Sequence, residues 1–324
     1  MKDRLYIATA LLTLAVLSAC SADETDVERC ATRGNVISLT STLAVTRAAG
    51  DLQTTQIDTA VVVGVFGADG TSLVTGGNNA AYTVSSDGSL TAKSGTMEWP
   101  ATGSISLYAY APYRSGWTQG TDDFNVATDQ TTAAGYLNSD LLYGTPAANP
   151  VEQTEDAVTL TFRHLLSKMT VKVVKADEET DITDAVLYIC GTHTGTTLNL
   201  ATGQLGEASG ETADIRIASP LGQDNTACAV VVPQTIAAGT RLVRMLLADR
   251  MLTATVASPV TLEGGKAYTF TFKVENAELL LGNVTVNDWV TGDTWEETDA
   301  VDETGNVESN LGDDATEPAR SKLR

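Results

Sequence analysis

The sequence predicts an all-β protein built from two β-sandwich domains in tandem. Short apolar runs recur between residues 36 and 286, Gly, Asn and Asp separate them, and helical periodicity of any length is missing. Residues 158–174 read VTLTFRHLLSKMTVKVV, with apolar residues at even positions up to Phe162 and at odd positions from Met169. Because strand side chains change face at every residue, two strands must meet in a bulge or bend near 164–168. We interpret this seam as the meeting point of the two domains.

The first twenty residues read MKDRLYIATALLTLAVLSAC. Lys2 and Arg4 precede an apolar run that is too short to span a bilayer, and the run ends in Leu-Ser-Ala-Cys20. This pattern resembles bacterial lipoproteins, in which the nucleophilic thiol is acylated and cleavage then leaves it at the N-terminus. Several acyl chains on one residue anchor a protein firmly. We expect residues 1–19 to be a lipoprotein signal peptide and Cys20 to be the lipidation site; the alternative is a plain signal peptide with a chance cysteine.

An acidic stretch follows Cys20. Residues 21–28 read SADETDVE and hold four acids and no base. The stretch resembles the export signal that sends Bacteroidetes lipoproteins to the outer face of the outer membrane, and it is equally typical of a solvated tether. We therefore assign residues 20–47 to an acidic tether followed by a detachable first strand.

The charge balance excludes some partners. The chain carries 20 basic and 41 acidic residues, and removal of residues 1–19 leaves 18 and 40, a net charge of −22. Nucleic acids and anionic lipid surfaces repel such a chain, so we expect neither as a partner. About 300 mature residues are enough to bury two cores of ordinary size.

The first predicted strand covers residues 36–45, VISLTSTLAV. Ile37, Leu39, Leu43 and Val45 occupy alternate positions, with Ser41 as the single gap, so the strand has one apolar face. Arg47-Ala48 follows in a segment of small residues that a protease could enter. This combination predicts a detachable strand and a cleavage site, whereas the plain interpretation is an ordinary first strand followed by a loop.

The other predicted strands follow the same alternation. They cover residues 60–67, 81–84, 89–92, 104–111 and 140–144 before the seam, and 184–190, 196–200, 213–217, 227–233, 242–248, 252–256, 268–274 and 279–286 after it. Asp87-Gly88 predicts a tight hairpin turn. Counting strands places the two domains at residues 48–176 and 177–292, with a boundary near 176–181 and Pro150 as the alternative.

The aromatic residues around 108–117 allow two interpretations. Tyr108 and Tyr110 share one strand face, and Tyr113, Trp99 and Trp117 lie nearby in the sequence. They form either a sugar-binding platform or, as we prefer because Pro112 ends the strand, a cluster at the rim of the core.

Cys190 and Cys228 fall on predicted strands of one domain and form either a disulfide or two buried thiols. Residues 293–317 contain ten acids and no base. Self-repulsion and the lack of apolar residues predict a disordered acidic tail over residues 293–324.

Several segments between residues 40 and 290 resemble the fimbrillin family of Bacteroidetes. They are LAVTRAAGD, VGVFG, SLYAYAPY, DLLYG, LTFRHLLSKMTVKV, VVPQTI with the AAGT after it, and VNDW. The resemblance implies two transthyretin-like β-sandwich domains in tandem, export as a lipoprotein, and cleavage after an arginine that removes the first strand. Arg47-Ala48 occupies the matching position. The acidic tail departs from the short ending that is usual in the family.

The sequence shows no motif for catalysis or metal binding. His164 lies on the seam, where we expect it to pack or form a hydrogen bond, and His193 lies in GTHTGTT without metal ligands at suitable spacing. G-x-S-x-G, P-loop and H-E-x-x-H patterns are missing. We therefore expect no enzyme, no metal and no cofactor.

The leading hypothesis is a structural subunit of a cell-surface fimbria. It is exported as a lipoprotein to the outer membrane, is cut after Arg47, and assembles with other fimbrial subunits by strand exchange. The alternatives are a monomeric surface lipoprotein that binds glycans and a fimbrial anchor or tip subunit that keeps its lipid.

Overall fold

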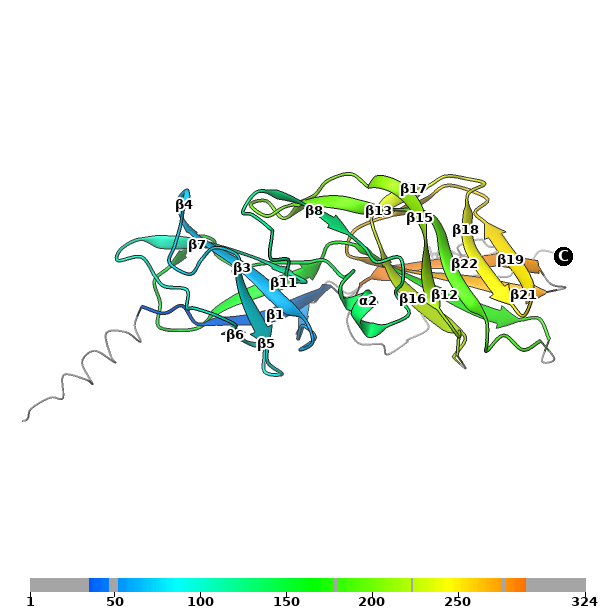
Figure 1. The fold of residues 1–324 in the computed structure, drawn as a ribbon, viewed down its shortest axis with the longest axis horizontal. Helices are drawn as coiled ribbons and strands as arrows, with labels where there is room; N and C mark the ends of the chain where they lie inside the picture. Colours follow the sequence, from blue (N-terminus) through cyan, green and yellow to red (C-terminus); the bar gives the residue numbers. More distant parts are fainter. Residues whose placement is uncertain (1–34, 47–51, 178–179, 223, 276–277, 290–324) are drawn as a thin grey trace, which may run out of the picture. The chain divides into compact units, whose positions relative to one another are not determined.

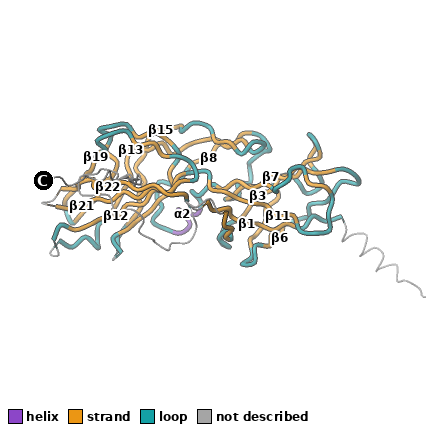
Figure 2. Tube along the Cα trace, turned by 180° about the vertical axis from the view of Figure 1, so that it is seen from behind, coloured by secondary structure: helices purple, strands orange, loops and turns teal. Residues whose placement is uncertain are grey.

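The computed structural model of the protein describes residues 35–46, 52–177, 180–222, 224–275 and 278–289. The chain divides into two compact units, Met1–Val36 and Ile37–Arg324, and the named strands all lie within the second unit. Strands dominate the described residues, and the only helix among them is the five-residue α2 (Ala133–Leu137), purple in Figure 2. The predicted all-β fold class is confirmed. None of the helices in these ranges has the length and apolar character needed to span a bilayer.

Most strands before the seam pair into a closed ring (Figure 1). Its members are β1 (Leu39–Thr46), β3 (Val62–Asp69), β5 (Ala80–Val84), β6 (Ser89–Ala92), β7 (Ser104–Ala111), β9 (Leu142–Thr145) and β11 (Val158–His164). The pairing runs β1–β11–β9–β7–β3–β5–β6 and returns from β6 to β1. The short strands β2 (Leu52–Thr55), β4 (Ser72–Leu73) and β10 (Val151–Glu152) pair with β1, β3 and β7. Except for β1 with β11, all these pairs are antiparallel.

Alternate side chains of the ring strands fill its core. In β11 the side chains of Val158, Leu160 and Phe162 are buried while Thr159 and Thr161 between them are exposed. Ile105 and Leu107 of β7 belong to the same apolar cluster. The period-2 pattern read from the sequence is therefore the pattern of burial. The predicted turn at Asp87-Gly88 joins β5 to β6, with Gly88 at φ +83°.

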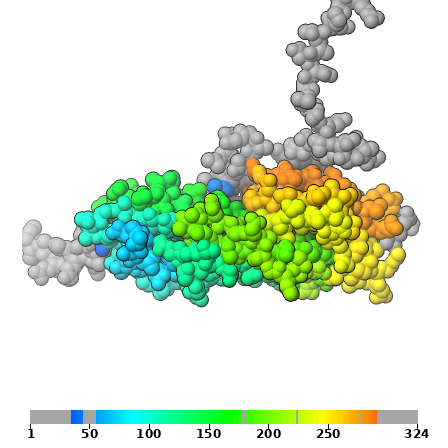
Figure 3. All heavy atoms as spheres, turned by 90° about the horizontal axis from the view of Figure 1, so that it is seen from above, coloured from blue at the N-terminus to red at the C-terminus, as the bar shows by residue number. Residues whose placement is uncertain are grey.

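The strands after the seam form two larger sheets and one small one. A four-stranded sheet runs β16 (Thr226–Val231), β12 (Ser167–Lys175), β21 (Lys266–Glu275), β22 (Glu278–Asp288). A six-stranded sheet contains β8 (Thr121–Asn125), β13 (Val186–Asn199), β14 (Gln204–Leu205), β15 (Ser209–Ala218), β18 (Arg241–Leu247) and β19 (Arg250–Thr255), and β17 (Gln234–Ile236) pairs with β20 (Val260–Leu262). Both large sheets contribute to one apolar cluster, for example Val171, Phe270 and Ile189. β19 contacts β22, and Figure 3 shows their yellow and orange atoms side by side.

The seam is where the chain changes sheets. β11 ends at His164 in the ring and β12 begins at Ser167 in the four-stranded sheet, with Leu165 and Leu166 both buried between them. The expected change of face near 164–168 is thus present. Sheet membership changes ten residues before the boundary expected near 176–181, and β10, which follows Pro150, still pairs with β7 of the ring. The division into domains at 48–176 and 177–292 stays a prediction.

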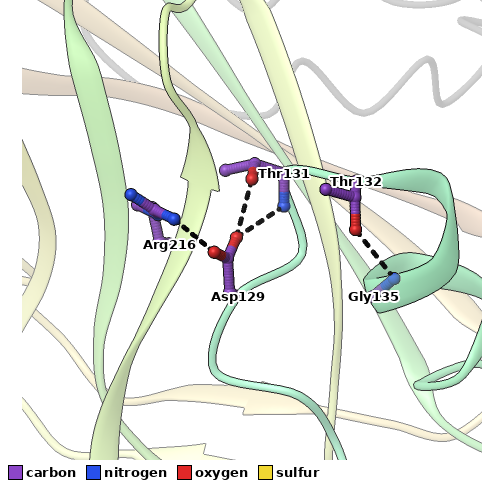
Figure 4. A network of polar contacts seen from close by, with 5 residues as sticks. All are labelled: Asp129, Thr131, Thr132, Gly135 and Arg216. Carbon is purple, nitrogen blue, oxygen red and sulfur yellow. Dashed lines mark hydrogen bonds and ion pairs between the residues drawn. The ribbon is translucent and has the colours of Figure 1, made fainter.

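A segment before the seam pairs with the sheets after it. β8 pairs with β13, and the side-chain amide of Gln130 exchanges two hydrogen bonds of 2.8 Å with the backbone of Val230. Asp129 forms an ion pair with Arg216 of β15 and accepts two hydrogen bonds from Thr131 (Figure 4). The pKa of the Asp129 carboxyl is lowered, mainly by its hydrogen bond with Arg216. Residues 121–131 therefore connect the part of the chain before the seam with the sheets after it, through strand pairing, hydrogen bonds and an ion pair.

Candidate functional site

The candidate site is β1 together with the strands on either side of it, which we call the β1 slot. On one side β1 runs parallel to β11, with Leu39 opposite Val158 and Leu43 opposite Phe162. On the other side it runs antiparallel to β6 at its start and antiparallel to β2 from Leu43 onward. β1 is thus an interior strand with paired edges, placed between β6 and β11 in Figure 1.

The predicted apolar face of the first strand points into the ring core. Ile37, Leu39 and Leu43 are 4%, 3% and 2% exposed. The side chain of Val45 lies outside the described residues. Burial of an aliphatic side chain contributes about 1.5–3 kcal/mol, so these three contribute about 4.5–9 kcal/mol as an upper bound. Burial of these side chains therefore holds β1 in the ring in addition to its chain connection to β2.

The gap in the apolar pattern, Ser41, is also buried, at 1% exposure. Its hydroxyl donates a hydrogen bond of 3.1 Å to the carbonyl of Gly88, and its backbone N–H donates one of 2.7 Å to the same oxygen. The apparent interruption of the strand is therefore a satisfied polar contact in an apolar surrounding.

The outer face of β1 is polar. Thr40 lies opposite Thr159 of β11, and their hydroxyls are 3.0 Å apart, within hydrogen-bond distance. Thr42 lies opposite Thr161 in the same way. Polar outward positions and apolar inward positions together fix which face of β1 enters the core.

The predicted processing residues are beyond what the structure describes. Cys20, Arg47 and Ala48 lie outside the described residues, as does the tail from 293 to 324. Residues 47–51 connect β1 to β2, and these two strands pair antiparallel with Thr46 opposite Leu52. The predicted cleavage site thus falls in the connection between two paired strands.

The end of β1 adjoins the seam. Leu43 lines a cavity of about 290 Å³ together with Asp140, His164 and Trp289. The His164 side chain is 2% exposed, its Nδ1 is 2.8 Å from Asp140 Oδ1, and its ring stacks on Trp289 with centroids 3.9 Å apart. His164 is therefore a packed and hydrogen-bonded residue, as expected. Sequence reasoning missed Asp140 and Trp289, because neither side chain carries a local signal for this contact.

Three of the five aromatic residues considered as a platform, Trp99, Tyr110 and Trp117, are buried. Tyr110 is fully buried, and its ring stacks on Trp117 with centroids 4.3 Å apart. Its hydroxyl is 2.8 Å from both Asn79 Oδ1 and the carbonyl of Arg114, and burial raises its pKa to about 12. Trp99 is buried in the ring core. Tyr108 and Tyr113 are partly buried and pack against the apolar cluster that contains Tyr110 and Trp117.

The remaining polar candidates are His193 and the two cysteines on predicted strands. His193 Nδ1 bonds to the carbonyl of Gly210, and within the described ranges no three His, Cys, Asp or Glu side chains gather as metal ligands would. Cys190 on β13 and Cys228 on β16 are separate thiols in the structure. Burial raises the pKa of the Cys190 thiol to about 12, which makes it a poor nucleophile.

The comparisons with known proteins identify the family. The model of the fimbrillin-like family matches residues 46–289, so this chain belongs to that family. Two solved structures, both of proteins assigned to cell adhesion, are similar. The one from Bacteroides ovatus has a TM-score of 0.64 at 18% identity, and the one from Bacteroides uniformis has 0.60 at 22%. Each comparison covers 80% of this chain and 99% of the other chain, and at these identities they show a shared fold. Among curated protein sequences no match is found.

Proposed function

We propose that this protein is a structural subunit of a cell-surface fimbria, exported as a lipoprotein and assembled by strand exchange after cleavage behind Arg47. Membership in the fimbrillin-like family supports a fimbrial subunit with a structural rather than an enzymatic role. The observation that carries the assembly mechanism is the place of β1. It is the first strand of the ring, it is paired on both edges, and only residues 47–51 connect it to β2 and the remainder of the chain.

Cleavage in the 47–51 connection would leave β1 held by non-covalent contacts alone. Loss of β1 would then expose the β11 backbone groups that now pair with residues 39–43, and those of β6 and β2 on the other side. Unpaired strand edges beside an open apolar core strongly favour the addition of another strand. A replacement strand that reproduces the pairing of β1 would run parallel to β11 and antiparallel to β6.

Processing at this site would also change where the subunit is held. The segment removed, residues 20–47, includes the expected lipid on Cys20. The uncut subunit is therefore held at the outer membrane, and the cut subunit is free to join neighbouring subunits in the fibre. The strong negative charge of the chain argues against nucleic acid as a partner.

The test compares Arg47→Ala with the control Arg33→Ala, which removes an arginine that precedes β1 in the sequence. Wild type and Arg33→Ala should give fibres whose subunits begin at Ala48. Arg47→Ala should give lipid-bearing monomers with unbroken N-termini, as read by mass spectrometry and electron microscopy. Fibres from Arg47→Ala would contradict the proposal, and fibres whose subunits keep a lipidated Cys20 would instead indicate an anchor or tip subunit.

A further inference from the structure

The contact between Ser41 and Gly88 singles out one position in the β1 slot. Ser41 is the one polar residue on the inward face of β1, between Leu39 and Leu43. The Gly88 carbonyl has two lone pairs, and the N–H and the hydroxyl of Ser41 both donate to it, at 2.7 and 3.1 Å. Both the backbone and the side chain at this position are therefore recognised.

The turn that contains Gly88 lies in close contact with β1. Gly88 has φ +83°, and a Cβ atom there would lie 2.6 Å from the carbonyl oxygen of Ser41 and 2.4 Å from Gln56 Oε1. Hydrogen bonds from the backbone and hydroxyl of Ser89 to Asp87 further fix the turn. A side chain at position 88 would therefore collide with the β1 backbone, and because Ser41 is 1% exposed, a larger side chain at position 41 would have to displace its neighbours.

Apolar contacts alone leave the register of a strand in the slot ambiguous. A slip by two residues keeps the same face inward, but it moves Leu39 or Leu43 to position 41 and Ser41 to a leucine position. Position 41 distinguishes the two registers, because a slipped strand would place the side chain of Leu39 or Leu43 beside the Gly88 carbonyl. A single buried polar position is a known means of fixing register elsewhere in proteins.

We propose that Ser41 and Gly88 form a register key: the β1 slot selects a strand that carries serine at this position and apolar residues two positions before and after it. The inference rests on the proposed strand exchange. The partner it defines is an extended segment of a second subunit with the pattern apolar–x–Ser–x–apolar, which enters in the direction of β1. Segments that are equally apolar but carry the hydroxyl elsewhere are rejected.

The experiment uses the full chain with the recognition site of a specific protease placed in residues 47–51. This protease cuts the connection between β1 and β2 and does not require Arg47. Three synthetic peptides of residues 35–46 compete for the slot: the native one, Ser41→Ala, and a double variant with Ile37→Ser and Ser41→Ile. The double variant has the native composition with the hydroxyl moved by four residues, and it contains no apolar–x–Ser–x–apolar pattern in any register. The readout is the amount of peptide bound and of β1 released, measured by native mass spectrometry.

The native peptide should replace β1, Ser41→Ala should bind about five-fold more weakly, and the double variant more than about ten-fold more weakly. Equal binding of the native peptide and the double variant would overturn the register key while leaving strand exchange intact. If no peptide replaced β1, including the native one, strand exchange itself would be contradicted and the register key with it. A second readout in the uncut chain is hydrogen exchange at the N–H of residue 41, which should be faster in Ser41→Leu than in the wild type; equal exchange rates would also overturn the key.

Discussion

Leu43→Ala directly tests how firmly β1 is held. Leu43 is 2% exposed and packs in the ring core opposite Phe162 on β11. Truncation of a buried leucine to alanine costs about 2–5 kcal/mol. If β1 is bound to the slot as an independent strand after cleavage, its dissociation constant should rise by about 30- to 4,000-fold, since 1.4 kcal/mol is a factor of ten.

The matched control is Thr42→Ala on the same strand. Thr42 is partly buried and faces outward, opposite Thr161, so its truncation should change the free energy of unfolding by about 1 kcal/mol or less. Both variants are cut between β1 and β2, and the loss of β1 and the onset of fibre growth are followed over time. Leu43→Ala should lose β1 sooner and polymerise with a shorter lag. The reasoning would be refuted if Leu43→Ala, though less stable before the cut, released β1 no faster than Thr42→Ala.

Three further predictions concern other parts of the chain. Cys20→Ala should leave uncleaved precursor and abolish surface display, and normal acylation of that variant, read by mass spectrometry, would rule out lipidation at this residue. Gly64→Ala should lower the free energy of unfolding, measured by denaturant titration, by about 1–3 kcal/mol, because its Cβ would lie 2.4 Å from the buried ring of Tyr110. The control Gly116→Ala has open space around its Cβ and should change the free energy of unfolding by less than about 0.5 kcal/mol. Equal losses in the two variants would contradict the packing argument. Burial raises the pKa of Tyr82 and of Tyr110 to about 12, above the value near 10 expected in the unfolded chain. The stability that these two residues contribute is therefore complete below pH 10 and is lost as the pH rises toward 12. Tyr82→Phe should make the fall in the free energy of unfolding over this pH range less steep, and an unchanged slope would contradict this prediction.

Local alternation was sufficient to predict many of the elements. β7 has the predicted bounds of 104–111, β6 those of 89–92, and the seam near 164–168 lies where the parity of apolar residues changes. These features depend on residues that are close in the sequence, because a strand with one buried face has apolar residues at alternate positions. The three described apolar residues of the first strand are buried for the same reason, while its detachment stays a prediction.

The features that were missed depend on residues far apart in the sequence. β8 reads TDDFN and has a single apolar side chain, Phe124, so its pairing with β13 is set by the surrounding fold. β13 continues through GTHTGTT, which resembles a turn, because bulges absorb the irregular residues there. The role of Ser41 needed the Gly88 carbonyl, and the contact of His164 needed Asp140, and no pattern in one sequence connects such pairs.

Assembly by strand exchange requires that β1 is removed before the subunits join. The direct measurement is the N-terminal residue of the subunits in fibres purified from the cell surface. We expect Ala48, with no lipid and no peptide from residues 20–47 in the fibre. Fibres whose repeating subunit begins at an acylated Cys20 would contradict this expectation.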